Sequence, residues 1–182
     1  MVYLILAEGF EEIEAIAPVD ILRRADIEVK TVSITNELMV TGGHGICIKA
    51  DITLRQIEFD TLEMLVLPGG LGGVNAIAGS PAAMELIEKV LKAGRKIAAI
   101  CAAPTLLAKL GVADNLTFVS YPTVSNDIIN AGGTYVPDKN VVCDNNIITG
   151  KAAGSSIEFA LELVAALLDK KTAEQIRSAM IC

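Results

Sequence analysis

Hydrophobic residues follow two distinct patterns along this chain. The runs 2–7, 64–67 and 97–100 are continuously apolar, as expected of buried strands, whereas 11–25 and 81–91 place apolar residues at helical spacing. The same criteria predict a strand at 29–34, hairpins over 39–48 and 141–149, and helices over 101–110, 155–168 and 172–180. Buried strands alternating with helices predict an α/β fold, a doubly wound sandwich in which helices cover both faces of a mainly parallel sheet.

Nothing along the sequence marks a boundary between domains. The chain has 182 residues, with no internal repeat, no low-complexity segment and no Pro/Gly/Ser-rich linker. Because this length suits one domain, residues 1–182 are expected to fold as a single unit. Pro18 lies inside the first predicted helix, where it predicts a kink or a broken turn.

Composition narrows the classes of protein that this sequence can encode. With 52% hydrophobic residues the chain is too apolar for a disordered protein, and with 4% aromatic residues its core must be mostly aliphatic. A net charge of −7 argues against nucleic acid as a partner, because phosphate binding needs a basic face. The apolar runs fall short of the ~18 residues of a membrane span, and the N-terminus lacks the basic region of a signal peptide. We therefore expect no membrane partner.

The four cysteines, at positions 47, 101, 143 and 182, are scattered along the chain. The only histidine is His44, so the sequence offers no Cys/His cluster for a structural metal, and no metal site is predicted. Thiols without a disulfide framework are typical of reducing compartments, and we expect a cytoplasmic protein.

Cys101 is the cysteine whose position suggests chemistry. It directly follows the predicted strand 97–100, and the small residues Ala102 and Ala103 permit a tight turn like the nucleophile elbow, which presents one side chain at a strand tip. At such a turn we expect the following helix to lower the pKa of the thiol. The position is equally compatible with a small residue that only packs, and packing explains the other three cysteines better.

A glycine pair ends the neighbouring strand. Because the carboxyl ends of parallel strands share one edge of a sheet, Leu67-Pro68-Gly69-Gly70 is expected near Cys101, where its backbone N–H groups could hold an oxyanion. The glycines in residues 69–75 match neither the spacing of the dinucleotide-binding motif nor that of the P-loop. No cofactor is therefore expected.

Three carboxylates open the first predicted helix. A favourable interaction with the helix dipole explains Glu11 and Glu12. Glu14 lies one turn further along, on the apolar face, where burial would raise its pKa. A buried, protonated Glu14 could donate a hydrogen bond to a thiolate, which makes it a candidate acid/base partner of Cys101.

Taken together, the segments Glu11-Glu12-Ile13-Glu14, Leu67-Pro68-Gly69-Gly70 and 98–104 resemble the DJ-one/ThiJ/PfpI superfamily, in particular its parkinsonism-associated, deglycase-like branch. The resemblance covers nearly the whole chain. It implies a flavodoxin-like fold, usually in a homodimer, with Cys101 as the reactive nucleophile and Glu14 as its protonated partner. The oxyanion pocket that it implies consists of Gly69, Gly70 and Ala102.

Two positions depart from patterns within that superfamily. Protease-type relatives often place a histidine after the nucleophile, where this chain has Ala102, and His44 falls in a predicted hairpin as a solvent-exposed turn residue. Peptide hydrolysis by a Cys–His pair is therefore disfavoured. Tyr121-Pro122 replaces His-Pro in the loop expected to face Cys101, and we assign both residues to the substrate pocket. A phenol with a pKa of about 10 is no base at neutral pH, but it can donate a hydrogen bond.

The resemblance implies a glyoxalase or deglycase that acts on small 2-oxoaldehydes such as methylglyoxal, or on their protein adducts, during carbonyl or oxidative stress. The alternative is a redox-sensing or chaperone-like protein in which the same cysteine is oxidised to sulfinate without turnover. A binding module with an inert cysteine is the third interpretation, and the thiamine-biosynthesis and protease names of some relatives are weaker guides. The apolar face of the first helix and the 39–48 hairpin are candidate surfaces for a homodimer.

Overall fold

A seven-stranded sheet forms the centre of the computed structural model, which describes residues 1–181. Its strands lie in the order β10 (Val141–Asp144), β11 (Ile147–Gly150), β7 (Lys96–Ile100), β6 (Met64–Leu67), β1 (Val2–Leu6), β2 (Val29–Ser33) and β5 (Ile52–Thr53). All neighbours pair in parallel except β10, which is antiparallel to β11. The mainly parallel sheet predicted from the continuous apolar runs is confirmed.

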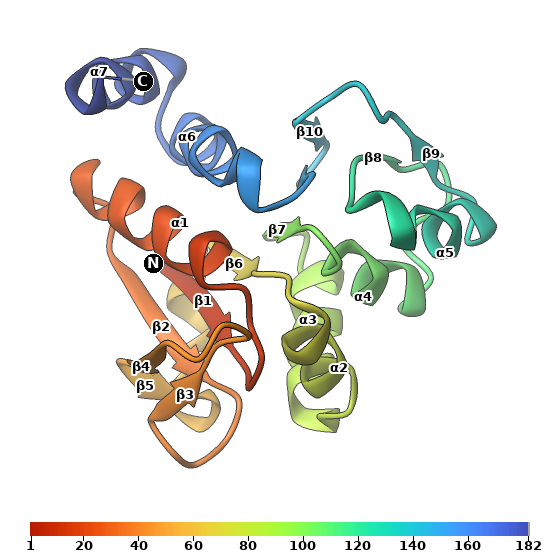
Figure 1. Ribbon diagram of the computed structural model, residues 1–182, viewed down its shortest axis with the longest axis horizontal. Coiled ribbons are helices and arrows are strands. Elements are labelled where there is room, and N and C mark those ends of the chain that lie inside the picture. Colours follow the sequence, from red (N-terminus) through yellow and green to blue (C-terminus); the bar gives the residue numbers. More distant parts are fainter. Residues whose placement is uncertain (182) are drawn as a thin grey trace.

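Helices cover both faces of this sheet (Figure 1). One face carries α1 (Glu12–Arg24), α6 (Ser156–Leu167) and α7 (Lys170–Met180), and the other carries α2 (Leu71–Ala78), α3 (Pro81–Lys92) and α4 (Pro104–Lys109). The predicted α/β sandwich is confirmed. No helix within residues 1–181 is both long and apolar enough to cross a membrane.

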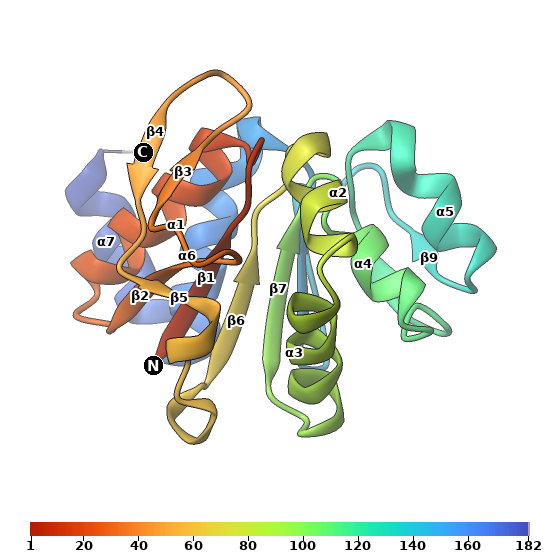
Figure 2. The ribbon, with the colours of Figure 1, turned by 90° about the horizontal axis from the view of Figure 1, so that it is seen from below.

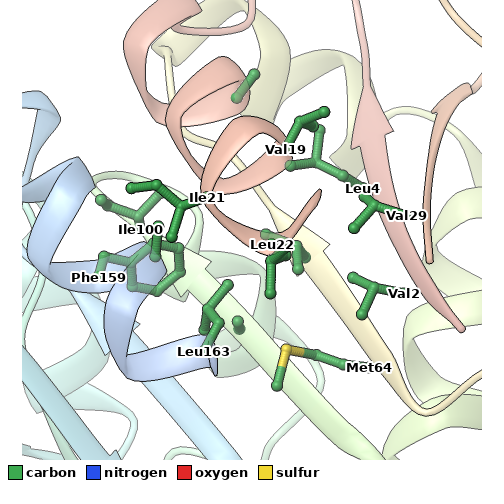
Figure 3. Packing of buried hydrophobic residues seen from close by; sticks show 14 of the residues in the cluster. Val2, Leu4, Val19, Ile21, Leu22, Val29, Met64, Ile100, Phe159 and Leu163 are labelled. Atoms are coloured by element: carbon green, nitrogen blue, oxygen red, sulfur yellow. The ribbon is translucent and has the colours of Figure 1, made fainter. Parts of the chain in front are cut away.

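Burial on both faces explains why the central strands are continuously apolar. In β1, Leu4 and Leu6 belong to the core beneath α1 and α6, whereas the alternating Tyr3 and Ile5 belong to the core beneath α2 and α3. Figure 3 shows part of the first core, where side chains of α1 and α6 pack beside those of the central strands. An apolar residue is therefore needed at every strand position, not at every second one.

Smaller elements surround the sheet. The predicted hairpin consists of β3 (Met39–Thr41) and β4 (Cys47–Lys49), and β10 and β11 form the second predicted hairpin. Three further elements were not predicted: the parallel strands β8 (Thr117–Phe118) and β9 (Thr134–Tyr135), and the helix α5 (Ser125–Asn130). Short 3-10 turns occur at Leu54–Gln56, Phe59–Thr61, Pro122–Val124 and Ala153–Ser155. Cys182 lies outside the described residues.

Three local predictions need correction. Helix α1 continues through Pro18, so the broken turn, one of the two expected outcomes, is absent; Ile21 and Leu22 beyond the proline are buried in the core and stabilise the last turns. A helix, α2, follows Gly70, where the sequence predicted no element. Helix α4 begins at Pro104 and not at Cys101, so two residues of turn, Ala102 and Ala103, separate the cysteine from the helix.

Candidate active site

Cys101 lies on a sharp turn at the carboxyl end of β7. Its φ of 65° is in the left-handed region, which non-glycine residues rarely adopt. Backbone hydrogen bonds hold the turn on both sides: the Cys101 N–H donates to the Gly150 carbonyl at 2.9 Å, and the Tyr121 N–H donates to the Cys101 carbonyl at 2.8 Å. The sharp turn predicted from the sequence is therefore present, with the cysteine partly exposed.

Glu14 points its carboxyl group into the interior beside this turn. The residue is fully buried, and its Oε2 accepts the Gly69 N–H at 2.8 Å. Its buried Oε1 makes no hydrogen bond of acceptable geometry to any residue of the described chain. Burial raises the pKa of Glu14 to about 7, although interactions with the Cys101 thiol and the Gly69 N–H lower it in part. The raised pKa expected for Glu14 is confirmed.

The two glycines that end β6 allow the cysteine and the carboxyl to converge. A Cβ at Gly69 would lie 2.5 Å from Oε2 of Glu14 and 2.6 Å from Cβ of Cys101, so both side chains border the same small space. Gly70 has a φ of 81°, and a Cβ there would lie 2.5 Å from the Gly9 carbonyl oxygen. Only glycine fits at either position.

The pKa of Cys101 departs from the sequence prediction. Burial, and then the charge of Glu14, raise the pKa of the thiol to about 12, while the N–H groups of Gly70 and Ala102 act in the opposite direction. The predicted lowering is wrong because burial and the charge of Glu14 outweigh these two N–H groups, and because α4 is short and begins only after the turn. Because the two groups interact, they titrate as a pair, and its first proton leaves near pH 7.

The remaining predicted site residues lie around this pair. The N–H groups of Gly70 and Ala102 interact with the sulfur, whereas the Gly69 N–H, which was also expected in the oxyanion pocket, donates to Glu14. Tyr121 is fixed next to Cys101 through its backbone and is 44% exposed. The exposed Pro122 begins the 3-10 turn that follows.

Glu12 has a role that the sequence analysis missed. Its carboxylate is buried and contacts the loop of the β3–β4 hairpin, where Oε2 lies 2.9 Å from Nδ1 of the exposed His44. Glu11, Glu12 and His44 are the only group within residues 1–181 that brings three potential metal-ligating atoms within 4.8 Å of one another. Because Glu12 is already hydrogen-bonded by the hairpin, we assign it to loop attachment. Gly42 was the available signal, since a Cβ at this position would collide with the Glu12 side chain.

Comparison with known proteins gives this arrangement a family. The DJ-1/PfpI family model matches residues 1–166. Protein dj-1beta of Drosophila melanogaster is 39% identical over 178 residues, 98% of this chain and 95% of the relative. Its crystal structure matches with a TM-score of 0.94 over 99% of this chain and 96% of the other.

Two further matches extend the comparison. The structure of oxidized Toxoplasma gondii DJ-1 is 32% identical, with a TM-score of 0.91 over 99% of this chain and 97% of the other. A Pyrococcus abyssi protein named a deglycase is 31% identical over 90% of this chain and 96% of the relative. The chain belongs to the DJ-1/PfpI family.

Proposed function

We propose that this protein is a cysteine-dependent glyoxalase or deglycase that acts on small 2-oxoaldehydes such as methylglyoxal, or on their protein adducts. The observation that carries this proposal is the buried Glu14 carboxyl, with a pKa of about 7, beside a partly exposed thiol on a strained turn. A carboxyl that titrates near neutral pH can both donate and accept a proton. The name of the Pyrococcus abyssi relative supports the same class of reaction.

The singly charged pair carries its negative charge mainly on Glu14. The reaction begins from its minor form, in which the thiol proton has moved to Glu14 and the negative charge lies on the Cys101 sulfur. The sulfur adds to the aldehyde carbon of methylglyoxal, and the aldehyde oxygen takes the proton from Glu14. The product is a hemithioacetal. The N–H groups of Gly70 and Ala102, which interact with the sulfur, stabilise negative charge as it moves from sulfur to oxygen.

Glu14, now a carboxylate, then moves a proton between carbons. It removes the proton from the former aldehyde carbon and returns a proton to the adjacent ketone carbon. The hydroxyl proton of the hemithioacetal passes to the former ketone oxygen, and the product is a thioester of lactate. Water hydrolyses the thioester, breaks the carbon–sulfur bond and regenerates the thiol. One carbon is oxidised while its neighbour is reduced, so the conversion consumes only water.

Consumption of methylglyoxal, with lactate as the measured product, tests this proposal. Cys101→Ser should lose at least about a hundredfold in rate, because a hydroxyl is a far weaker nucleophile than a thiolate. Cys143→Ser, which removes a thiol on β10, is the matched control and should retain the wild-type rate. Equal rates for wild type and Cys101→Ser, or no turnover in either, would refute the proposal.

The same geometry supports a second function, redox sensing. Each peroxide molecule would transfer one oxygen atom to the Cys101 sulfur and leave as water, giving first a sulfenic and then a sulfinic acid. The N–H groups of Gly70 and Ala102 favour this function because they can bind the added oxygens, and the Toxoplasma gondii relative is described as oxidized. Intact-mass analysis after mild peroxide treatment separates the two functions: selective addition of two oxygens at Cys101 without methylglyoxal turnover favours sensing.

We also propose that the chain forms a homodimer through the outer face of α1. Exposed isoleucines gather there around an apolar groove, which is lined by Ile13, Ile16, Ile46 and Ile157 among others. A second copy would remove this apolar surface from water. Sedimentation should give a dimer for wild type and a monomer for Ile16→Asp, and a monomeric wild type would rule the dimer out.

A further inference from the structure

The loop of the β3–β4 hairpin closes over a buried carboxylate at the start of α1. Glu12 is only 6% exposed, and its Oε1 accepts the backbone N–H groups of His44 at 2.7 Å and Ile46 at 3.4 Å. Its Oε2 lies 2.9 Å from Nδ1 of His44. A Cβ at Gly42 would collide with the Glu12 side chain. One carboxylate therefore organises the whole loop.

Backbone hydrogen bonds attach the same loop to the segment 8–12, which connects β1 to α1. The Gly43 N–H donates to the Phe10 carbonyl at 2.7 Å, and the Gly9 N–H donates to the Thr41 carbonyl at 2.8 Å. Figure 2 shows this hairpin beside α1 at the edge of the sheet where β6 and β7 end. The hairpin thus supports the start of α1 from outside.

The segment 8–12 contacts the candidate active site on its other side. The Glu11 N–H donates to the Gly69 carbonyl at 3.1 Å, and the Gly69 N–H donates in turn to Glu14. Oε2 of Glu11 also accepts the Glu14 N–H at 2.7 Å. Two hydrogen bonds in series therefore connect segment 8–12 to Glu14, so a shift of this segment can move the Glu14 carboxyl.

His44 gives this attachment a charge that changes near neutral pH. Its side chain is 74% exposed, and histidine ordinarily has a pKa of about 6.5. The hydrogen bond to Glu12 and the charge of Glu12 raise the pKa of His44. Burial alone would raise the pKa of Glu12, but hydrogen bonds from His44 and Ile46 outweigh burial and lower it.

Three other carboxylates face this contact from the surrounding elements. Glu11 lies beside both partners, and Glu8 accepts the Thr41 N–H at 3.0 Å. Asp20, further along α1, lines the same groove as Glu12. Of the three, only Glu11 adds to the effect of Glu12 on His44: its charge also raises the pKa of the imidazole.

We propose that Glu12 and His44 form a pH-sensitive positioning contact: protonation of His44 tightens the hairpin onto segment 8–12 and so holds Glu14 and Gly69 beside Cys101. The tightening stands by itself, whereas its effect on Cys101 rests on the proposed function. The contribution of His44 is complete below its unfolded-state pKa of about 6.5 and is lost as pH rises through the higher folded-state value. The contribution of Glu12 is complete above about 4.5 and is lost as pH falls through its lowered folded-state pKa. The contact is therefore strongest between about pH 4.5 and 6.5.

Hydrogen exchange at the His44 and Ile46 amides of the full chain measures the tightening directly, once intrinsic exchange rates are corrected for. In wild type, the protection of these amides should increase about threefold between about pH 8.5 and 6, the size expected when one partner of an ion pair is exposed. In His44→Gln, which cannot be protonated, this increase should disappear. Glu8→Gln is the matched control: Glu8 binds the same hairpin without contacting the imidazole, so the increase should remain.

An unchanged protection of the two amides across this pH range in wild type overturns the proposal, as does an increase that survives in His44→Gln. Alkylation of Cys101 in the same proteins tests the positioning. The pH profile of the alkylation rate should differ by about threefold between wild type and His44→Gln, and should not differ between wild type and Glu8→Gln. Identical profiles in wild type and His44→Gln overturn the positioning role. Neither hydrogen exchange nor alkylation requires turnover. A failure of this proposal can therefore be told apart from a failure of the proposed function, which is tested by comparing methylglyoxal consumption in wild type and Cys101→Ser.

Discussion

Within residues 1–181, two cysteines contact a carboxylate: Cys101 lies beside Glu14, and Cys143 lies beside Glu162. The thiol of Cys143, on the edge strand β10, donates a hydrogen bond to Oε1 of Glu162 at 3.3 Å. In both pairs, burial and the carboxylate raise the pKa of the thiol to about 12. A carboxylate beside a cysteine is therefore not enough to identify a reactive thiol.

The surroundings of the two pairs differ in ways that bear on chemistry. Cys101 is on a left-handed turn with two backbone N–H groups at its sulfur, whereas Cys143 lies in a regular strand with Lys170 as the opposing charge. Glu14 is fully buried, and its own pKa is raised to about 7. The comparison indicates that the partner acid, which can exchange a proton at neutral pH, distinguishes the candidate active site.

The largest expected difference between the pairs is in turnover. Glu14→Gln removes the carboxyl that we propose moves a proton between the substrate carbons, so the rate of methylglyoxal consumption should fall by about a thousandfold. Glu162→Gln is the matched change at the other pair and should leave the rate unaltered. Equal losses in both variants would show that the comparison between the pairs has no functional meaning.

The second difference is in how stability depends on pH. Glu14 keeps its proton up to about pH 7 in the folded chain but releases it near 4.5 when unfolded, so protonation favours the folded state. The stabilisation is complete below pH 4.5 and is lost as pH rises to 7, by roughly 3 kcal/mol in wild type. Chemical denaturation across this range should show the loss in wild type and not in Glu14→Gln. A parallel dependence in the two proteins would contradict the raised pKa.

The third and smallest effect concerns the glycine that separates Cys101 from Glu14. In Gly69→Ala the new methyl group would overlap both side chains, which should cost about 2 kcal/mol in unfolding free energy. Gly154→Ala is the control, because a Cβ at Gly154 meets no atom within 4 Å, and it should change stability by less than about 0.5 kcal/mol. Thermal unfolding of both variants measures this difference, and equal stabilities would mean that the approach at Gly69 is looser than described.

Much of the fold could be predicted from the sequence because the central strands are buried on both faces. The strands at 2–7, 64–67 and 97–100 agree with the structure to within about one residue at each end. Helix α2 could not be predicted, because its first turn contains Gly72 and Gly73, which favour a loop locally. The structure uses these glycines to let Gly9 and Phe10 approach: a Cβ at Gly73 would lie 2.8 Å from the Phe10 Cα.

The candidate site could be predicted where it depends on local sequence. It could not be predicted where it depends on contacts between residues that are far apart in the sequence. The turn at Cys101 and the burial of Glu14 follow from a strand end and from helical spacing. The direction of the Cys101 pKa shift depends on burial and then on the charge of Glu14, and both come from segments distant in sequence. The contact of Glu12 with His44 likewise joins residues 32 positions apart.

The central claim is that Cys101 and Glu14 titrate as one pair, and the pH dependence of Cys101 alkylation tests it most directly. In wild type the rate should rise with a midpoint near pH 7, where the pair loses its first proton: most of the charge then lies on Glu14, and a minor, reactive form carries it on the sulfur. In Glu14→Gln that rise should move up to the range of an isolated thiol, about 8.5 or above. Identical profiles in the two proteins, or a wild-type rate that stays flat up to about pH 9, would contradict the account.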